Sequence, residues 1–390
     1  MGLQLENRDE TGYAGLYIHV PFCARKCPYC HFCSVSDLHK VEAFLGGVIQ
    51  EMDLVSPPGA LFDTLYMGGG TPSLLKQGQI VDILKGAHGR FDFIQDVEAT
   101  IEVNPDTVSL DALAAFLSHG INRVNMGIQS FDEKRLRFLG RLHSARKARE
   151  AIRLARKAGV ENLGLDLMYG LPNQSRKEWL SDLVEATCYE PEHLSCYMLT
   201  YEKGTPFDQR LKAGELRPLS ADKMRDLFKV TVDFLSDRGY EHYEISNFAR
   251  GRGLRSRHNQ KYWSHSPYTG LGPSAHSFLA PMRWWNHRTL SDYLQALRNG
   301  ALPVKGREAL TQGQLMLESV FLGLRTCDGV DMLAFKRRYH VDFQNHFGPV
   351  LERLEGQGLL SVSSNRCTLT MAGMMVADAI AGLFAEHIKT

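Results

Sequence analysis

The sequence predicts an α/β protein, with a partial (β/α)6 TIM-like barrel followed by a small C-terminal α+β domain of winged-helix-like shape. Short apolar runs alternate with amphipathic helical stretches over residues 15–199, which is the pattern of a parallel sheet. The pattern changes after residue 199, and the last part of the chain predicts helices followed by a hairpin. With 390 residues, the chain is long enough for one large and one small domain.

Six strands are predicted in the first region from short runs of apolar and β-branched residues. They are expected at residues 16–20, 64–67, 100–103, 123–128, 163–168 and 194–199. Helices are expected between them, and the clearest spans residues 144–158, with Ser144 as its N-cap and Gly159 at its end. Six βα units in a row fit either an open doubly wound sheet or a barrel.

The positions of polar and glycine residues favour the barrel. They follow the carboxyl ends of successive strands, where barrel proteins build their active sites, whereas an open sheet concentrates its site at one switch point. The positions concerned are a cysteine loop after the first strand, Gly68, Gly69, Gly70 and Thr71 after the second, Glu102 and Asn104 at the third, Gln129 at the fourth, and Asp166 and Tyr169 at the fifth.

The stretch YIHVPFCARKCPYCHFC, residues 17–33, holds four of the eight cysteines of the chain. The sequence begins MGLQLENRDE, which has no apolar signal-peptide core, so we expect a cytoplasmic protein in a reducing environment where disulfides are rare. Four thiols in one short loop then indicate a metal site. Zinc is one alternative, but structural zinc sites usually divide their ligands between two knuckles, and the other cysteines are scattered singly.

The spacing C-x3-C-x2-C after an apolar strand resembles the signature of the radical S-adenosylmethionine (SAM) superfamily. The resemblance implies a barrel of the radical SAM type in which Cys23, Cys27 and Cys30 hold three irons of a [4Fe-4S] cluster. It also implies that SAM chelates the fourth iron. Cys33 could bind that iron instead, but the signature is complete without it, so we expect a spectator thiol. We expect His31 to hydrogen-bond near the cluster rather than to ligate it.

The segment GGGTPS matches neither a dinucleotide-binding motif nor a P-loop. Its glycines would let the backbone approach a ligand, although a plain tight turn is the alternative. With IEVNPD, GIQSF, LGRLH and LDLMYG, it resembles the anaerobic coproporphyrinogen III oxidase group of radical SAM proteins. The resemblance implies a SAM site lined by Tyr17, Tyr29, Gly69, Gly70, Thr71, Glu102, Gln129, Arg141 and Asp166.

Residues 241–307 contain many aromatic residues, histidines and arginines with little periodicity, so we expect an irregular functional segment that packs on the barrel. It includes the motif H-N-x-x-Y-W, formed by His258, Asn259, Tyr262 and Trp263. One interpretation is a turn leading to buried aromatic residues. The other is a haem site, because a flat macrocycle needs aromatic walls, an imidazole ligand and arginines for its propionates. The candidate arginines are Arg252, Arg255, Arg257 and Arg283, and His276 and His287 are competing ligands.

This motif resembles the HemW subfamily of haem chaperones, and the likeness runs from Tyr17 to about Phe384. Residue 32 is Phe, as in that subfamily, where the oxidases have a fourth cysteine, and the long N-terminal extension of the oxidases is absent. His31, Asn125 and Cys33 depart from the usual pattern. These departures bear on the tuning of the cluster rather than on its presence.

The predicted domain organisation has four parts. They are an N-terminal tail at 1–14, the barrel at 15–240, the irregular segment at 241–307 and the C-terminal domain at 308–390. In the last part, helices at 315–324 and ending near 354 precede two short strands and a final helix at 372–385. DNA binding by this winged-helix-like domain is disfavoured, because only Arg366 is basic in the expected wing.

We therefore interpret the sequence as a haem chaperone that binds a [4Fe-4S] cluster, SAM and haem. It would deliver haem to acceptor proteins, with respiratory haemoproteins among the candidates. The enzymatic alternative is oxygen-independent coproporphyrinogen III oxidation, an oxidative decarboxylation to protoporphyrinogen IX through a 5′-deoxyadenosyl radical. Nucleic acid is disfavoured because 45 basic residues balance 44 acidic ones. No apolar run reaches the ~18 residues of a membrane span, and peripheral membrane contact stays open.

Overall fold

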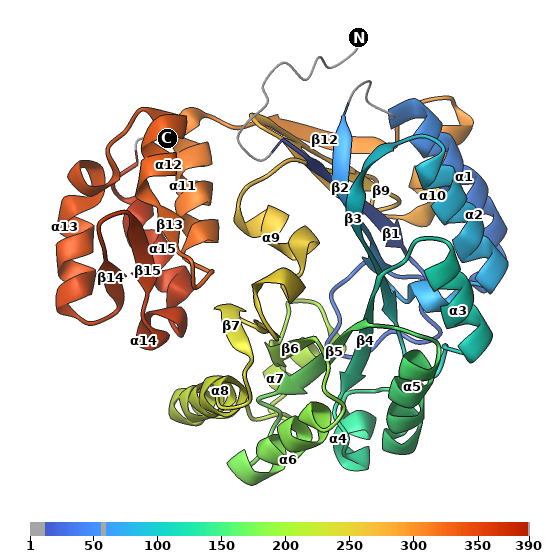
Figure 1. Ribbon diagram of the computed structural model, residues 1–390, viewed down its shortest axis with the longest axis horizontal. Helices are drawn as coiled ribbons and strands as arrows, with labels where there is room; N and C mark the ends of the chain where they lie inside the picture. Colours follow the sequence, from blue (N-terminus) through green and yellow to red (C-terminus); the bar gives the residue numbers. More distant parts are fainter. Residues whose placement is uncertain (1–11, 56–59, 389–390) are drawn as a thin grey trace.

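The computed structural model describes residues 12–55 and 60–388, and its largest feature is one curved twelve-stranded sheet (Figure 1). The strand order is β12-β11-β10-β9-β1-β2-β3-β4-β5-β6-β8-β7. The central strands are parallel and are β1 (Ala14–Val20), β2 (Leu61–Gly69), β3 (Asp92–Val103), β4 (Arg123–Gln129), β5 (Asn162–Tyr169) and β6 (His193–Met198). These are the six predicted strands in sequential order, which confirms the predicted partial barrel; β12 and β7 end the sheet without closing it.

Helices cover the convex face of the sheet (Figure 1). They are α1 (Val41–Val55), α2 (Gln77–His88), α3 (Leu110–Ser118), α5 (Ala145–Lys157), α6 (Arg176–Thr187) and α8 (Ala221–Ser236), while the short helices α4 (Glu133–Phe138) and α7 (Pro206–Lys212) follow β4 and β6. Helix α5 begins and ends as predicted. The Ser144 hydroxyl accepts a hydrogen bond from the Lys147 N–H at 3.1 Å, and Gly159 has a φ of +92° just after the helix.

Alternation along the strands separates an apolar face from a polar one. In β1, Leu16, Ile18 and Val20 are fully buried in the apolar core between sheet and helices. Tyr17 and His19 point to the opposite, concave side, because successive side chains of a strand alternate. The polar residues of neighbouring strands therefore meet inside the curve of the sheet.

The prediction that residues 241–307 are irregular is wrong. The segment forms β7 (Glu241–Glu244), β8 (Asn247–Ala249), α9 (Arg257–Trp263), β9 (Tyr268–Leu271), β10 (His276–Leu279), β11 (Met282–Asn286) and α10 (Leu290–Arg298), and β12 (Val304–Ala309) follows at its end. These strands extend both edges of the same sheet. They escaped prediction because strands of three to six residues are too short to show a clear hydrophobic period.

Helix α9 lies on the concave side of the sheet (Figure 1). Its first backbone N–H groups are bound by Glu98 of β3, which accepts from Arg257 at 2.9 Å and from His258 at 3.0 Å. Lys261 pairs with Asp63 of β2 at 2.6 Å. Because Glu98 and Asp63 precede the carboxyl ends of their strands, α9 fills the amino-terminal end of the barrel interior.

Glu51 ties the sheet extension to α1. Its carboxylate is 1% exposed and accepts hydrogen bonds from the Gly272 N–H at 2.7 Å, the Tyr293 hydroxyl at 2.6 Å and the Asn286 amide at 2.5 Å. These donors come from the turn after β9, from α10 and from β11. Burial raises the pKa of Glu51 to about 7, although the three hydrogen bonds oppose that increase.

The C-terminal domain packs beside the sheet (Figure 1) and contains a three-stranded sheet of order β13-β15-β14. Its elements are α11 (Gln312–Gly323), β13 (Val330–Asp331), α12 (Met332–Tyr339), α13 (Phe343–Gly356), β14 (Leu360–Val362), β15 (Arg366–Leu369), α14 (Met371–Met374) and α15 (Ala377–Ala385). The predicted hairpin is confirmed as β14 and β15. The predicted final helix at 372–385 is divided into α14 and α15. In the described ranges, no helix is long and apolar enough to span a membrane.

The raised pKa of Glu51 predicts a pH-dependent stability difference. An unfolded glutamate titrates near pH 4.5 and the folded one near 7, so the folded protein holds an extra proton between these values and Glu51 stabilises it less as pH rises through this window. The variant Glu51→Gln lacks this titration. We expect the free energy of unfolding of the wild type, measured with urea relative to Glu51→Gln, to be about 2–3 kcal/mol greater at pH 5 than at pH 8. A pH-independent difference would contradict the buried position of Glu51.

Candidate functional site

Three cysteine thiols lie in the loop that follows β1, beyond its carboxyl end. The Cys30 N–H donates to the Cys27 carbonyl at 3.1 Å, which closes a turn between them. Two residues from other segments reach the sulfur atoms: the Thr71 hydroxyl lies 3.8 Å from the Cys23 sulfur, and the Arg141 guanidinium lies 3.7 Å from the Cys27 sulfur. The loop is thus tied to the segment after β2 and to the segment between α4 and α5.

The fourth cysteine of the loop faces elsewhere. Burial raises the pKa of Cys30, and the other two predicted ligand thiols raise it further, so the three lie within electrostatic reach of one another. Burial also raises the pKa of Cys33, but its charged neighbours are Arg288 and Lys26, which lower it. The Cys33 thiol donates to the Arg288 carbonyl at 2.8 Å. His31 is exposed beside it.

The glycines after β2 allow close backbone contacts that a side chain would prevent. A Cβ on Gly69, whose φ is +108°, would lie 2.5 Å from the His19 ring. A Cβ on Gly70 would lie 2.5 Å from the Phe22 carbonyl oxygen. Gly70 also donates to the Val20 carbonyl at 2.8 Å, so this strand end and the start of the cysteine loop are packed backbone against backbone.

Glu102 of β3 reaches across to this glycine segment. Its carboxylate accepts from the Tyr66 hydroxyl at 2.7 Å and from the Gly69 N–H at 3.2 Å. Burial raises the pKa of Glu102 to about 7, and the nearby charge of Asp166 adds to the increase. A cationic ligand at this position would favour the ionised carboxylate.

Arg141 joins β3, β4 and the cysteine loop. Its guanidinium donates to the Asn104 side-chain oxygen at 2.5 Å and to the Gly127 carbonyl at 2.8 Å. Asn104 in turn donates to the Thr71 hydroxyl at 2.9 Å. The predicted residues Thr71 and Arg141 are therefore brought into one hydrogen-bonded network.

Several buried polar atoms in this interior lack partners among the described residues. They include Gln129 Oε1, Asn125 Oδ1 and Arg141 Nε. Gln129 is held with a φ of +68°, and Asp166 accepts from the Asn125 amide at 2.7 Å. Because buried polar atoms are nearly always hydrogen-bonded in native proteins, these groups fit a polar ligand with both donors and acceptors, as SAM has.

The predicted aromatic residues lie at two places in the site. The Tyr17 hydroxyl of β1 forms a hydrogen bond of 3.0 Å with Nδ1 of the His19 ring, inside the barrel. Tyr29 lies in the cysteine loop, with its ring 6.3 Å from that of Phe207. Burial raises the pKa of both tyrosines, so both stay protonated at neutral pH.

The H-N-x-x-Y-W motif lies in α9, at the amino-terminal end of the barrel. His258 is 1% exposed, and its ring nitrogens lie 2.8 Å from the Thr64 hydroxyl and 2.9 Å from the Tyr262 hydroxyl. Burial lowers the pKa of His258 to about 3, so the ring is neutral. A haem iron could bind His258 only after one of these hydrogen bonds had been broken.

The other residues of the motif and most of its arginines are also engaged in the fold. The Asn259 N–H donates at 3.3 Å to the Ser256 hydroxyl, which caps α9, and the ring of Trp263 lies 5.5 Å from the Arg325 guanidinium. Three predicted propionate partners pair instead with carboxylates: Arg255 with Glu241 and Asp328, Arg257 with Asp96, and Arg283 with Glu308 and Glu318. The motif thus forms the floor of the barrel.

Two residues of the site were not predicted from the sequence, namely His19 and Tyr66. His19 lies between the Tyr17 hydroxyl and the Cys33 carbonyl, which is 2.9 Å from its Nε2. Tyr66 stacks on His258 with ring centroids 5.0 Å apart and donates to Glu102. The alternation of side chains along β1 and β2 was the signal available, since both residues share the concave face with recognised site residues.

Gly70 offers a test of the close backbone packing. We expect Gly70→Ala to lower the free energy of unfolding by about 1–3 kcal/mol, because the added methyl group meets the Phe22 backbone, which cannot rotate away. Gly78→Ala is the matched control, since its Cβ meets nothing within 4 Å in helix α2. This change should be neutral or stabilising by up to about 1 kcal/mol. The measurement is the midpoint of thermal unfolding of the two variants. Equal midpoints would contradict the close packing of Gly70 against the Phe22 backbone.

The chain is similar to known proteins over nearly its whole length. Residues 17–184 match the family model of the radical SAM superfamily, and residues 310–376 match that of the HemN C-terminal domain. A protein of Lactococcus lactis named "Heme chaperone HemW" is 32% identical over 368 residues, which cover 93% of this chain and 95% of the relative. The protein of the same name from Bacillus subtilis is 31% identical over 376 residues, covering 95% and 99%.

A solved structure shows the same fold. Coproporphyrinogen III oxidase (HemN) from Escherichia coli, described as a radical SAM enzyme, superposes with a TM-score of 0.83 and covers 96% of this chain and 91% of its own. At 24% identity, this likeness concerns the fold alone. The full-length sequence matches decide the family: the chain belongs to the HemW family of the radical SAM superfamily.

Proposed function

We propose that this protein is a haem chaperone that binds a [4Fe-4S] cluster, SAM and haem, and passes haem to acceptor proteins. The observation that supports it best is that Cys23, Cys27 and Cys30 share the loop beyond the carboxyl end of β1, where Thr71 and Arg141 reach two of the sulfur atoms. The fourth thiol of the loop, that of Cys33, donates instead to the Arg288 carbonyl. Three thiolates leave one iron of a cubane cluster free for a further ligand. The relatives named haem chaperones match nearly the whole chain.

Cys23, Cys27 and Cys30 would hold the cluster. A bound cluster would bring a redox centre next to the sulfonium of SAM. Arg141 lies beside the Cys27 sulfur and stabilises a thiolate there through its positive charge. The Thr71 hydroxyl does the same for Cys23 as a hydrogen-bond donor.

The SAM site would use the interior of the barrel above α9. Glu102, together with the backbone of Gly69 and Gly70, is suited to the amino group of SAM, because its carboxylate is fixed by Tyr66 and faces the glycine segment. Asp166 and Gln129 offer acceptors for the ribose hydroxyls. Of the remaining predicted members, Tyr17, Thr71 and Arg141 hydrogen-bond within the surrounding network, and Tyr29 lies near Arg141 and Cys27.

The enzymatic alternative is oxygen-independent coproporphyrinogen III oxidation. The fold similarity to the Escherichia coli oxidase fits this alternative, but it concerns the fold alone. Phe32 argues against it, because the oxidases that the sequence resembles have a cysteine at this position. In its place, Phe32 is 67% exposed beside the cysteine loop. We therefore favour the chaperone.

The partners in this proposal are haem and haem-accepting proteins, including respiratory haemoproteins. A cytoplasmic location fits the need for reduced thiols at the cluster, since free cysteines persist in reducing compartments. Nothing in the charge balance calls for nucleic acid.

The cluster assignment can be tested by single substitutions. We expect Cys23→Ser, Cys27→Ser and Cys30→Ser each to lose most of the iron and sulfide after anaerobic reconstitution. Cys33→Ser is the matched control within the same loop and should keep about four irons per chain. Equal loss in Cys33→Ser would make Cys33 a ligand, and zinc without sulfide in the wild type would rule out the cluster.

The choice between chaperone and oxidase needs one parallel experiment. Protein with a reconstituted cluster receives SAM and a reductant, and then either haem or coproporphyrinogen III. We expect haem uptake, seen as a shifted Soret band, followed by transfer to an apo-haemoprotein, and no protoporphyrinogen IX. Turnover of coproporphyrinogen would instead favour the oxidase.

A further inference from the structure

Besides the barrel interior, the structure has a second pocket, between the cysteine loop and strands β10 to β12. Its volume is about 410 Å³, within the range of ~300–1,000 Å³ that is usual for small-molecule sites. It is lined by His31, Cys33, Ser274, His276, Trp285, Asn286, Arg288 and Lys305. Residues from the loop, β10, β11 and β12 thus meet at one place, although more than 200 positions separate Cys33 from Arg288.

The charge of this pocket is entirely positive. Arg288 and Lys305 line it, and no aspartate or glutamate does. Neither Arg288 nor Lys305 forms an ion pair with a carboxylate elsewhere in the described chain, unlike Arg255, Arg257 and Arg283. Two uncompensated cations in one pocket suit a ligand with two carboxylates.

His276 is placed as an iron ligand would be. It lies on β10 opposite Trp285 of β11, and their rings are stacked with centroids 5.9 Å apart at 27°. The side chain is exposed to the pocket, and its ring forms no hydrogen bond with any described residue. Burial and the charge of Arg283 lower the pKa of His276, so the imidazole is neutral and keeps a lone pair.

The floor of the pocket is rigid. The Ser274 N–H donates to the His287 carbonyl at 2.9 Å, and the Asn286 N–H donates to the Ala275 carbonyl at 2.9 Å. The Asn286 side chain is held by Glu51, which anchors this region to α1. His276 and Lys305 therefore stand on β10 and β12 of the hydrogen-bonded sheet, and Arg288 follows β11 by two residues.

We propose that this pocket is the haem site, with His276 as the ligand of the haem iron and Arg288 and Lys305 as partners of the two propionates. The inference rests on the proposed function, since it identifies where a haem chaperone of this structure holds its cargo. It assigns haem to the outside of the barrel rather than to the H-N-x-x-Y-W motif, whose histidine is enclosed and bonded at both nitrogens.

The cysteine loop serves both sites in this arrangement. In the proposed function Cys23, Cys27 and Cys30 would hold the cluster, while His31 and Cys33 line the second pocket. His19 connects the two, because its ring lies between the Tyr17 hydroxyl inside the barrel and the Cys33 carbonyl at the pocket. Loss of the cluster would therefore disturb one wall of the haem pocket.

The test is haem titration of the reconstituted protein and its variants. We expect His276→Ala to weaken haem binding by at least about tenfold and to change the Soret spectrum, as loss of an axial ligand does. The double variant Arg288→Ala, Lys305→Ala should weaken binding about as much without changing the spectrum at saturation, since propionate contacts position the ligand only. All these residues lie at the surface of the pocket, and iron content and circular dichroism would verify the fold.

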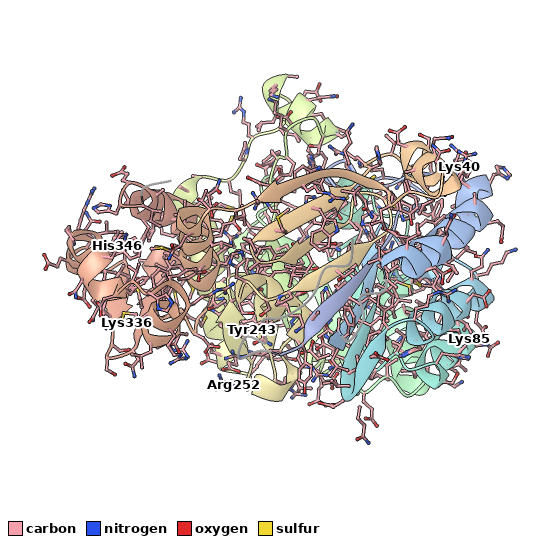
Figure 2. All side chains as sticks on the ribbon, turned by 90° about the horizontal axis from the view of Figure 1, so that it is seen from above. Lys40, Lys85, Tyr243, Arg252, Lys336 and His346 are labelled. Atoms are coloured by element: carbon pink, nitrogen blue, oxygen red, sulfur yellow. The ribbon has the colours of Figure 1, made fainter. Side chains whose placement is uncertain are left out.

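Matched controls come from three positions that do not line the pocket, and Figure 2 labels them. His346→Ala, in α13 of the C-terminal domain, controls for loss of a histidine. The double variant Lys40→Ala, Lys85→Ala controls for loss of two positive charges. Both should bind haem as the wild type does.

The outcomes separate this inference from the proposed function. A wild type that does not bind haem would refute the chaperone and, with it, the site. Haem binding by the wild type that His276→Ala leaves unchanged would overturn the inference alone. A loss confined to Cys33→Ser, with the spectrum of a thiolate-ligated haem, would likewise overturn the assignment of His276.

Discussion

The packing of helix α9 into the curve of the sheet is the contact on which the site depends. His258 stacks on Tyr66, the Tyr66 hydroxyl donates to Glu102, and Glu102 accepts from the Gly69 N–H. This column runs from the floor of the barrel to the glycine segment beside the cysteines. Since leaving a buried hydrogen-bonding partner unpaired costs about 1–3 kcal/mol, each member is held by the next.

The same interior explains why so many polar groups are tolerated in the middle of a large sheet. Burial alone disfavours charge there, and it raises the pKa of Glu102 to about 7. Hydrogen bonds satisfy most of the groups. Asn104, for example, accepts a hydrogen bond from Arg141 and donates one to Thr71. A few atoms, such as Gln129 Oε1, remain without a partner among the described residues and are the places where a bound nucleotide would gain most.

The cysteine loop has two faces, and the chain uses both. On one face, Thr71 approaches the Cys23 sulfur and Arg141 approaches the Cys27 sulfur. The other presents Cys33 toward Arg288 and the positively charged pocket. The cluster and the haem would then both contact the cysteine loop. A change at one of them could therefore reach the other through this short segment of backbone.

The sequence by itself determined the six parallel strands, the caps of α5 and the thiol spacing, because these follow from local periodicity and from chemistry within a few residues. Only the tertiary structure decided that residues 241–307 extend the sheet, that His258 lies in the barrel floor and that Cys33 faces a pocket. Each of these depends on a contact between distant segments: Thr64 meets His258 across 194 positions, and Cys33 meets Arg288 across 255. A one-dimensional pattern does not specify such pairings, because they arise only when the whole sheet has curved and brought its edges together.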